Sequence, residues 1–308
     1  MIQCAARRAP SRINRPRLLV IGCGDVGMRL LPLLRARFRV FAVTSQPERR
    51  AELRAAGAVP ILADLDERAT LRRLAALAPY IVHLAPPQPD GALDRRTRNL
   101  AAILPERARL VYISTSGVYG DCGGALIDET RPLAPQNARA RRRVDAEQVL
   151  RRWALSSHSA LSILRVPGIY AAGRLPLKRL EQGTPALCAE DDVYTNHIHA
   201  DDLARVIERA LYRARPGRVY HAADDSEMKM GDYFDAVADA FALPRPPRLA
   251  RAALERAVSP VLLSFMSESR RMSNRRMKAE LGVRLRYARV ADALAQERPA
   301  ARSNALDL

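Results

Sequence analysis

The chain has 308 residues, enough to bury the core of one large domain or of two that share an interface. No apolar run approaches the roughly 20 residues that a membrane helix needs, so no membrane contact is expected. The formal net charge is +18, but lysine occurs only at Lys178, Lys229 and Lys278, so 48 of the 51 basic residues are arginine. Aromatic residues make up only 5%. This composition indicates an arginine bias with general attraction to polyanions, and no specific nucleic-acid surface.

The N-terminal segment and the cysteines limit location and chemistry. Residues 1–16 contain arginines and no acids, and they lack the apolar core of a secretory signal. We expect a disordered basic tail, and an arginine-rich targeting leader stays open. Cys4, Cys23, Cys122 and Cys188 form no Cys-x-x-Cys pair and have no histidine at ligand spacing. The pattern predicts no metal site and no disulfide framework, and it favours a reducing, cytoplasmic location.

Strand-like and helix-like segments alternate along the first half of the chain. Strands are expected at 17–22, 39–45, 58–64, 80–87 (running into a loop), 109–116 and 160–168. Helices are expected at 25–37 (kinked at Pro32), 47–57, 67–77, 93–104 and 137–150. Further helical segments are expected near 230–241, 252–263 and 274–281. The alternation predicts an α/β fold of the Rossmann type, a doubly wound parallel sheet with helices on both faces.

One glycine pattern falls between the first strand and the first helix. The segment VIGCGDVGMRL contains G-x-G-x-x-G at Gly22, Gly24 and Gly27, with Asp25 and Val26 between the last two glycines. Gly22 permits a tight turn, Gly24 lets the backbone approach a pyrophosphate, and Gly27 lets the helix pack on the strand. The helix then offers its first amides and its positive dipole end to the phosphates. The motif predicts dinucleotide binding.

The end of the second strand bears on which dinucleotide binds. NAD-binding chains usually place an acid there for the ribose hydroxyls, whereas this chain has Thr44 and Ser45. The nearest acid, Glu48, completes a capping-box pattern with Ser45 that would occupy its carboxylate. Ser45 and Arg49 would suit a ribose 2′-phosphate. The sequence therefore favours NADP over NAD.

The segment VYISTSGVYGD (111–121) resembles the extended short-chain dehydrogenase/reductase superfamily, the NAD-dependent epimerase/dehydratase group. There, a fifth strand ends in Ser or Thr before a V-Y-G turn. The resemblance continues in ADLD (63–66), HLAPP (83–87), LRVPGIYAAGR (164–174), NHIHADDLARVIERAL (196–211) and SNRRMKAELGV (273–283), and so spans nearly the whole chain after the tail. It implies further cofactor contacts at Asp64, Leu65, Ala85, Pro86 and Pro167.

The helix at 137–150 departs from the family pattern. In the family it carries Tyr-x-x-x-Lys, with a Glu four residues beyond the Lys. Anchoring on Glu147 puts Arg143 at the Lys position and Arg139 at the Tyr position. A phenol with a lowered pKa can exchange a proton near neutral pH, whereas a guanidinium, with a pKa above about 12, stays protonated. Arg143 could still hydrogen-bond a ribose, but Arg139 cannot replace the tyrosine, so the chain resembles the atypical members.

Substitute catalytic groups are available in the sequence. Tyr119 in the V-Y-G turn and Tyr170 after the sixth strand are candidate phenols, and Thr115 occupies the family's Ser/Thr position. Either tyrosine could instead be a packing residue with a tethered hydroxyl. In the segment at 197–202, helix capping by an aspartate is favoured over acid–base work by its histidines.

These patterns give a domain organisation and two functional hypotheses. We expect an NAD(P)-binding Rossmann domain at 17–166 and a smaller, mostly helical substrate-binding part at 167–308, with segments around 195–225 returning to the first domain. The leading hypothesis is an NAD(P)-binding oxidoreductase or epimerase/dehydratase-like enzyme that acts on a small polar substrate. The alternative is an NAD(P)-binding regulator or sensor without turnover. The oligomeric state stays open, a homodimer included.

Overall fold

The structure is a computed structural model and describes residues 15–297. The expected basic tail therefore lies outside the described residues, except for Arg15 and Pro16. Within the described range the chain divides into two compact units. Unit 1 comprises 15–113, 145–163 and 207–218, and unit 2 comprises 114–144, 164–206 and 219–297.

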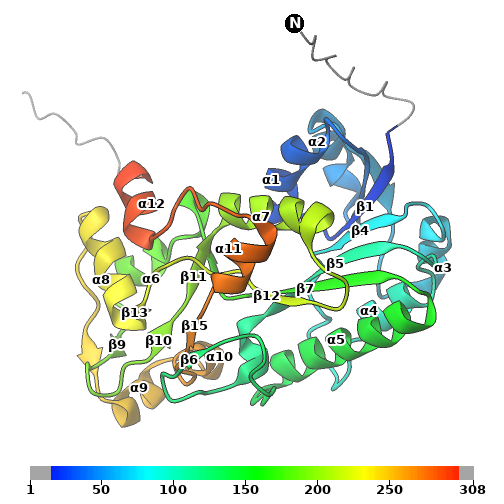
Figure 1. The fold of residues 1–308 in the computed structure, drawn as a ribbon. Coiled ribbons are helices and arrows are strands. Elements are labelled where there is room, and N and C mark those ends of the chain that lie inside the picture. Colours follow the sequence, from blue (N-terminus) through cyan, green and yellow to red (C-terminus); the bar gives the residue numbers. More distant parts are fainter. Residues whose placement is uncertain (1–14, 298–308) are drawn as a thin grey trace, which may run out of the picture. The chain divides into compact units, whose positions relative to one another are not determined.

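The largest sheet of the described chain has seven strands, in the order β12-β7-β5-β4-β1-β2-β3 (Figure 1). Its strands are β1 (Arg17–Ile21), β2 (Arg39–Thr44), β3 (Val59–Leu62), β4 (Tyr80–His83), β5 (Arg109–Thr115), β7 (Ala160–Val166) and β12 (Val219–His221). The pairs from β3 through β5 are parallel. β1 pairs with β2 on one side and with β4 on the other, so the strand order reverses beside β1. The expected doubly wound, Rossmann-type sheet is confirmed.

The central strands are apolar because helices cover both faces of such a sheet. In β1, the four residues Leu18, Leu19, Val20 and Ile21 are at most 1% exposed. This is the near-continuous hydrophobic run typical of a buried parallel strand. The carboxyl ends of β1 and β4 meet at the switch point, where sheets of this kind bind ligands.

Twelve α-helices lie in the described range. They are α1 (Asp25–Leu34), α2 (Arg50–Ala55), α3 (Arg68–Leu71), α4 (Arg95–Ala101), α5 (Ala138–Ser156), α6 (Leu177–Glu181), α7 (Ala200–Arg213), α8 (Met230–Ala240), α9 (Arg251–Ala257), α10 (Pro260–Phe265), α11 (Arg275–Leu281) and α12 (Val290–Glu297). Short 3₁₀ turns occur at Pro47–Arg49, Arg72–Leu74, Ser116–Tyr119 and Ala172–Arg174.

The single helical segment expected at 252–263 is two helices. Val258 takes extended backbone, with φ −126° and ψ 159°, and ends α9. The Ser259 side chain then accepts a hydrogen bond from the Leu262 amide, and Pro260 occupies the first turn of α10. The chain breaks here because proline lacks the N–H that a continuous helix would need and suits a helix start.

Four two-stranded sheets complete unit 2. They are β6 (Leu126–Ile127) with β15 (Arg271–Met272), β8 (Gly168–Tyr170) with β11 (His197–His199), β9 (Ala186–Leu187) with β14 (Arg248–Leu249), and β10 (Tyr194–Thr195) with β13 (Met228–Lys229). The β8–β11 pair sets Tyr170 opposite His199. Asp202 in α7 is fully buried, and its two carboxylate oxygens accept the amides of Arg286 and Tyr287 at 2.8 Å. Both oxygens are therefore used by a distant segment.

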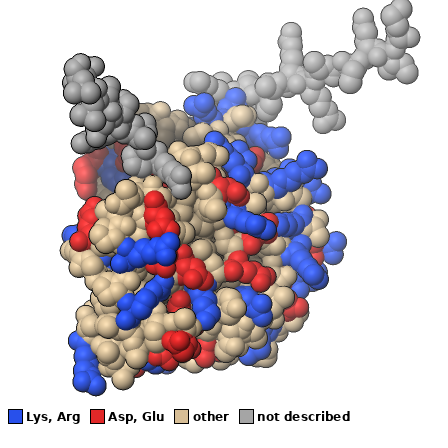
Figure 2. Space-filling view, turned by 90° about the vertical axis from the view of Figure 1, so that its left-hand side faces the viewer, with Lys and Arg blue, Asp and Glu red and all other residues tan. Residues whose placement is uncertain are grey.

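Charged side chains are mixed on the face drawn in Figure 2. There, acidic side chains are interspersed among the basic ones. Ion pairs account for some of these arginines: Arg96 pairs with Asp66 at 2.7 Å and Arg245 with Asp239 at 2.7 Å. None of the helices within 15–297 is long and apolar enough to cross a membrane.

Candidate functional site

The first cavity lies in unit 1 at the carboxyl ends of four neighbouring strands and measures about 250 Å³. It is lined by residues 21–24 at the end of β1, 43–46 and 49 at the end of β2 and beyond it, 63–65 after β3, and 85, 86 and 96 after β4. Eight of the expected cofactor residues meet here: Gly22, Gly24, Ser45, Arg49, Asp64, Leu65, Ala85 and Pro86.

The three motif glycines have different surroundings. Gly22 has φ +79°, and a Cβ there would lie 2.6 Å from the backbone N and Cα of Ala85. A Cβ on Gly27 would lie 2.9 Å from the Cys23 Sγ, so the start of α1 packs tightly. A Cβ on Gly24 would meet nothing within 4 Å. Gly22 is thus required by the backbone fold and Gly27 by close packing on the Cys23 side chain, whereas Gly24 leaves the cavity open for a ligand.

The end of β2 presents no acid to this cavity. The reason is not the capping box that the sequence predicted for Ser45 and Glu48. Gln46, and not Ser45, precedes the 3₁₀ turn, and no side chain caps it. The Thr44 hydroxyl instead accepts the Gln46 amide at 3.1 Å. The expected Ser45–Glu48 capping box is therefore wrong, because Pro47 starts the turn one residue later than the pattern requires. Glu48 is exposed and does not line the cavity.

Arg49 is fixed at the cavity edge by two contacts. Its Nη1 donates to the Cys23 carbonyl at 2.6 Å, which joins the guanidinium to the glycine loop. Its Nε donates to a Glu52 carboxylate oxygen at 2.9 Å. The same positive charge lies near the Cys23 thiol, yet burial dominates there and raises the pKa of Cys23 to about 11. The thiol is therefore neutral and gives the cavity no anionic nucleophile.

Sequence reasoning did not identify Arg96, which lines the same cavity. Its guanidinium forms a two-pronged pair with Asp66, at 2.7 and 3.0 Å, and donates to the Pro86 carbonyl at 3.2 Å. These side-chain hydrogen bonds lower the pKa of Asp66. Asp64 is fixed beside the pair, since its carboxylate accepts the Asp66 amide at 2.9 Å. No local motif marks Arg96, because its partner lies 30 residues earlier in the chain.

Some expected cofactor residues lie outside the first cavity. Asp25 pairs with Arg29 at 3.0 Å, one turn further along α1. Val26 and Gly27 do not line the cavity either, and Arg143 lines neither this cavity nor the second. Pro167 lines the second cavity.

The second cavity lies in unit 2 and measures about 490 Å³. Its wall includes the turn 115–117, the first turn of α5, residues 167–170 around β8, residues 194–197, and parts of α6, α8 and α10. Thr115 and Tyr170 line it, and Tyr119 does not. The Thr115 hydroxyl accepts the Gly117 amide at 3.3 Å, which orients it within the turn.

Tyr119 is a buried tyrosine with a fully used hydroxyl, 1% exposed. His221 Nδ1 lies 3.1 Å from the Ser273 carbonyl, which only accepts, so Nδ1 carries the proton and Nε2 is an acceptor. The Tyr119 hydroxyl donates to that Nε2 at 2.6 Å and accepts from Arg165 at 2.7 Å. Burial lowers the pKa of His221 to about 3, so this histidine stays neutral. Tyr119 therefore has no proton to offer a ligand in the second cavity.

Tyr170 is the candidate phenol that the fold does bring to the second cavity. Its hydroxyl is buried and faces the Asp224 carboxyl without hydrogen-bond geometry within the described chain. Burial first, and Asp224 second, raise the pKa of Tyr170. The His197 ring stacks on Tyr233 at 4.3 Å, and burial lowers the pKa of His197 to about 3. The phenol and the imidazole are therefore both neutral at pH 7.

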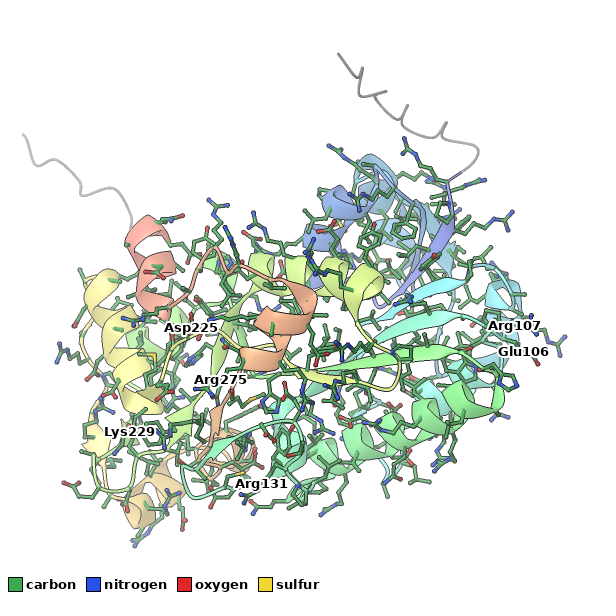
Figure 3. The ribbon with its side chains drawn as sticks, viewed as in Figure 1. Glu106, Arg107, Arg131, Asp225, Lys229 and Arg275 are labelled. Carbon is green, nitrogen blue, oxygen red and sulfur yellow. The ribbon has the colours of Figure 1, made fainter. Side chains whose placement is uncertain are left out.

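Asp224 is the buried acid behind this wall, 4% exposed. Burial raises its pKa to about 7, although the Ser226 amide donates to it at 2.9 Å. The next residue, Asp225, labelled in Figure 3, pairs with Lys278 and with Asn274, and its pKa is lowered. Sequence reasoning did not identify Asp224, since two adjacent aspartates differ here only in their tertiary surroundings.

These features define a class of protein: a Rossmann-type α/β protein with a glycine-rich loop after β1 and a second unit that carries its own ligand-sized cavity. Within residues 15–297 no group of three or more His, Cys, Asp or Glu side chains is arranged to hold a metal ion. The family model of the RmlD substrate binding domain matches residues 91–296, and that of the TrkA-N domain matches residues 18–78. The chain belongs to the RmlD substrate-binding domain family, which confirms the expected epimerase/dehydratase relationship.

Solved structures with the same fold cover nearly the whole chain. A conserved protein of unknown function from Silicibacter pomeroyi is 31% identical, with a TM-score of 0.76 over 92% of this chain and 98% of that one. The UDP-glucose 4-epimerase of Thermus thermophilus, in complex with NAD, is 20% identical, with a TM-score of 0.70 over 92% and 99%. The UDP-glucose 4-epimerase of Thermotoga maritima, with UDP-glucose, is 14% identical, with a TM-score of 0.72 over 90% and 96%. Comparison with curated protein sequences finds no match.

The raised pKa of Asp224 predicts a pH-dependent stability. The unfolded carboxyl ionises near its ordinary pKa of 3.8 and the folded one near 7, so the folded state holds the extra proton between these values. Stability from this group is present below pH 4 and is lost as the pH rises to 7. Asp224→Asn should therefore gain stability relative to the parent between pH 4 and 8, by about 4 kcal/mol at most.

The measurement is urea unfolding of parent and variant at several pH values. His197 and His221 titrate equally in both proteins and cancel in the difference. Asp239→Asn is the control, an exposed carboxyl whose pKa Arg245 lowers, and its difference from the parent should stay constant above pH 5. A parent–Asp224→Asn difference that does not change with pH would contradict the assignment.

Proposed function

We propose that this protein binds a nicotinamide dinucleotide in the first cavity, NADP in preference to NAD, and a small polar ligand in the second. The observation that carries the proposal is the open position at Gly24, between a sterically required Gly22 and the amino end of α1. A pyrophosphate suits this place, because Gly24 is exposed and the helix directs its first amides and its positive dipole end towards it. A related structure of the same fold holds NAD, which supports the cofactor class.

The preference for NADP rests on the edge of the cavity after β2. Ser45, Gln46 and Arg49 line it, and Glu48 does not, so no carboxylate after β2 faces the place of the adenine ribose. A 2′-phosphate would meet a serine hydroxyl and a guanidinium there. NAD would lack the acid that usually holds its two ribose hydroxyls.

The proposed chemistry is epimerase/dehydratase-like or oxidoreductive, without the usual phenol. The residues four positions before the chain's three lysines are Arg174, Asp225 and Asn274, so the sequence contains no Tyr-x-x-x-Lys. When bound, the cofactor would supply hydride chemistry. This chain's own residues would supply a cavity with the Thr115 hydroxyl, a neutral Tyr170 and several guanidiniums. We propose that turnover by the usual tyrosine route is slow or absent, which keeps a dinucleotide-binding sensor as the second candidate.

Gly24→Val tests the cofactor site. Because a Cβ at this position meets nothing within 4 Å, the variant should fold like the parent and lose dinucleotide binding by more than about 100-fold. Calorimetric titration with NADP and NAD measures the effect. Gly173→Val is the matched control, since its Cβ also meets nothing within 4 Å, and it should keep the parent affinity. Equal affinity of parent and Gly24→Val would refute the cofactor site.

Arg49→Ala tests the preference for NADP. Loss of a charge-assisted contact to the 2′-phosphate should weaken NADP about 10- to 100-fold and leave NAD nearly unchanged. Arg50→Ala, at the exposed neighbouring position, is the control and should bind both cofactors as the parent does. If the parent binds NAD more tightly, or if Arg49→Ala loses both cofactors equally, the preference is wrong.

Hydride transfer from NADPH to carbonyl and nucleotide-sugar substrates tests the chemistry. General acid–base help is worth about 10²- to 10⁴-fold, so without the usual tyrosine we expect slow turnover or none. Any residual turnover should fall with Tyr170→Phe, because Tyr170 lines the second cavity, and should survive Tyr119→Phe. Fast turnover that survives both substitutions would contradict the role of Tyr170. Tight NADP binding without any turnover would favour the sensor.

A further inference from the structure

Two guanidiniums on the wall of the second cavity are held by aromatic rings. Arg139, in the first turn of α5, and Arg179, in α6, both line the cavity. Each lies on an aromatic ring: the Arg139 Cζ is 4.2 Å from the centre of Phe265, and the Arg179 Cζ is 4.1 Å from that of Phe234. Within residues 15–297 neither one forms an ion pair. The rings hold the two cations in place without neutralising them.

The one carboxylate on this wall is already compensated. Glu268 accepts from the Asn137 amide group at 3.2 Å and from the Arg270 guanidinium at 2.8 Å. Arg270 also donates to the Gly120 carbonyl at 2.6 Å, which fixes the pair. The Arg270–Glu268 pair is therefore close to neutral. Burial lowers the pKa of Arg139, and the Glu268 charge offsets this only in part, so Arg139 and Arg179 both remain cations without an ion-pair partner among the described residues.

Arg179 is held in a half-buried position at an energetic cost. Its Nη2 donates to the Pro185 carbonyl at 2.9 Å, a neutral partner. Burial alone lowers its pKa to about 10, and no opposing charge raises it again. The group is still a cation at neutral pH. A half-buried cation without a counter-ion is unfavourable, and an anionic ligand would relieve that cost.

Arg139 lies beside the Thr115 turn. A Cβ on Gly117 would lie 3.8 Å from the Thr115 Oγ1 and 3.9 Å from the Ala140 Cβ, so this turn and the start of α5 are in contact. The Asn137 side chain accepts the Ala140 amide at 2.9 Å and so caps the helix. By the family resemblance, Arg139 stands where the proton-exchanging tyrosine would be. A guanidinium cannot exchange that proton, but its planar N–H groups match an oxyanion.

We infer that the second cavity binds an oxyanion group of its ligand, a phosphate or a carboxylate, through Arg139 and Arg179. At the start of α5, Arg139 would thus bind an anion where the family's tyrosine exchanges a proton. The inference rests on the proposed function in taking this cavity as the ligand site. A neutral polyol would leave both cations without a counter-charge, so the ligand is a small polar molecule that carries at least one anionic group.

Calorimetric titration with pyrophosphate, malonate and glucose tests the inference. All titrations use the full chain with Gly24→Val, so that pyrophosphate cannot occupy the glycine loop. Pyrophosphate or malonate should bind and glucose should not, and the stronger of the two anions identifies a phosphate or a carboxylate ligand. Arg139→Gln and Arg179→Gln should each weaken the anion about 10- to 100-fold, and Arg139→Lys should retain part of the affinity.

Arg152→Gln is the matched control. Arg152 is exposed on α5, the helix that carries Arg139, and its substitution removes one positive charge, as Arg139→Gln does. It should bind the anion as the parent does. If neither anion binds, if Arg139→Gln and Arg179→Gln bind like the parent, or if Arg152→Gln weakens binding equally, the inference is wrong. Circular dichroism verifies that each variant is folded. The NADP titration of the chain with Gly24 intact is a separate measurement, so failure of the cofactor site and failure of the anion site give different results.

Discussion

A Cβ at Gly22 would lie 2.6 Å from the backbone of Ala85, closer than side-chain carbons approach backbone atoms in folded proteins. The turn after β1 and the loop after β4 are therefore in direct backbone contact, at the point where the strand order reverses. This contact determines the shape of the first cavity. With the turn held against β4, α1 starts at the sheet edge and Gly24 faces open space. Arg49 then reaches the Cys23 carbonyl, which joins the end of β2 to the same loop.

The two cavities differ in how their charges are balanced. In the first, Arg96 is paired with Asp66 and Arg49 with Glu52, so the cations nearest the glycine loop are oriented by acids. In the second, the acid Glu268 is used by Arg270, while Arg139 and Arg179 rest on phenyl rings. Oriented cations suit a loop in which backbone amides already favour phosphate. Cations on rings suit a wall where the ligand itself must bring the counter-charge.

The buried polar residues of unit 2 explain why few of its conspicuous side chains are available for proton transfer. The Tyr119 hydroxyl hydrogen-bonds both His221 and Arg165, and none of the three lines the second cavity. The Asp202 carboxylate accepts the amides of Arg286 and Tyr287. The His197 ring is stacked on Tyr233 and is neutral. Burial removes water from these groups, so each is either fully hydrogen-bonded or held uncharged. Tyr170 and Asp224 are the exception, a buried phenol and a carboxyl of raised pKa that face each other next to the cavity.

The sequence by itself determined six strands of the sheet, the place of the glycine loop and the family, whereas β12 was expected only as part of a segment that returns to the first domain. These depend on local signals: apolar runs of strand length, helical spacing, and glycines where backbones must approach. The assignment of Arg139 to the position of the family's tyrosine stays a prediction from the sequence, since it rests on alignment within one helix. Hydrogen bonds and ion pairs between side chains of distant segments could not be predicted from the sequence. Tyr119 and Tyr170 each follow a strand. Only the tertiary contacts distinguish them: the Tyr119 hydroxyl is bonded to His221, 102 residues away, whereas the buried Tyr170 hydroxyl faces Asp224 and its residue lines the second cavity. Pairing, burial and pKa depend on which distant segments pack together, and only the tertiary structure decides that.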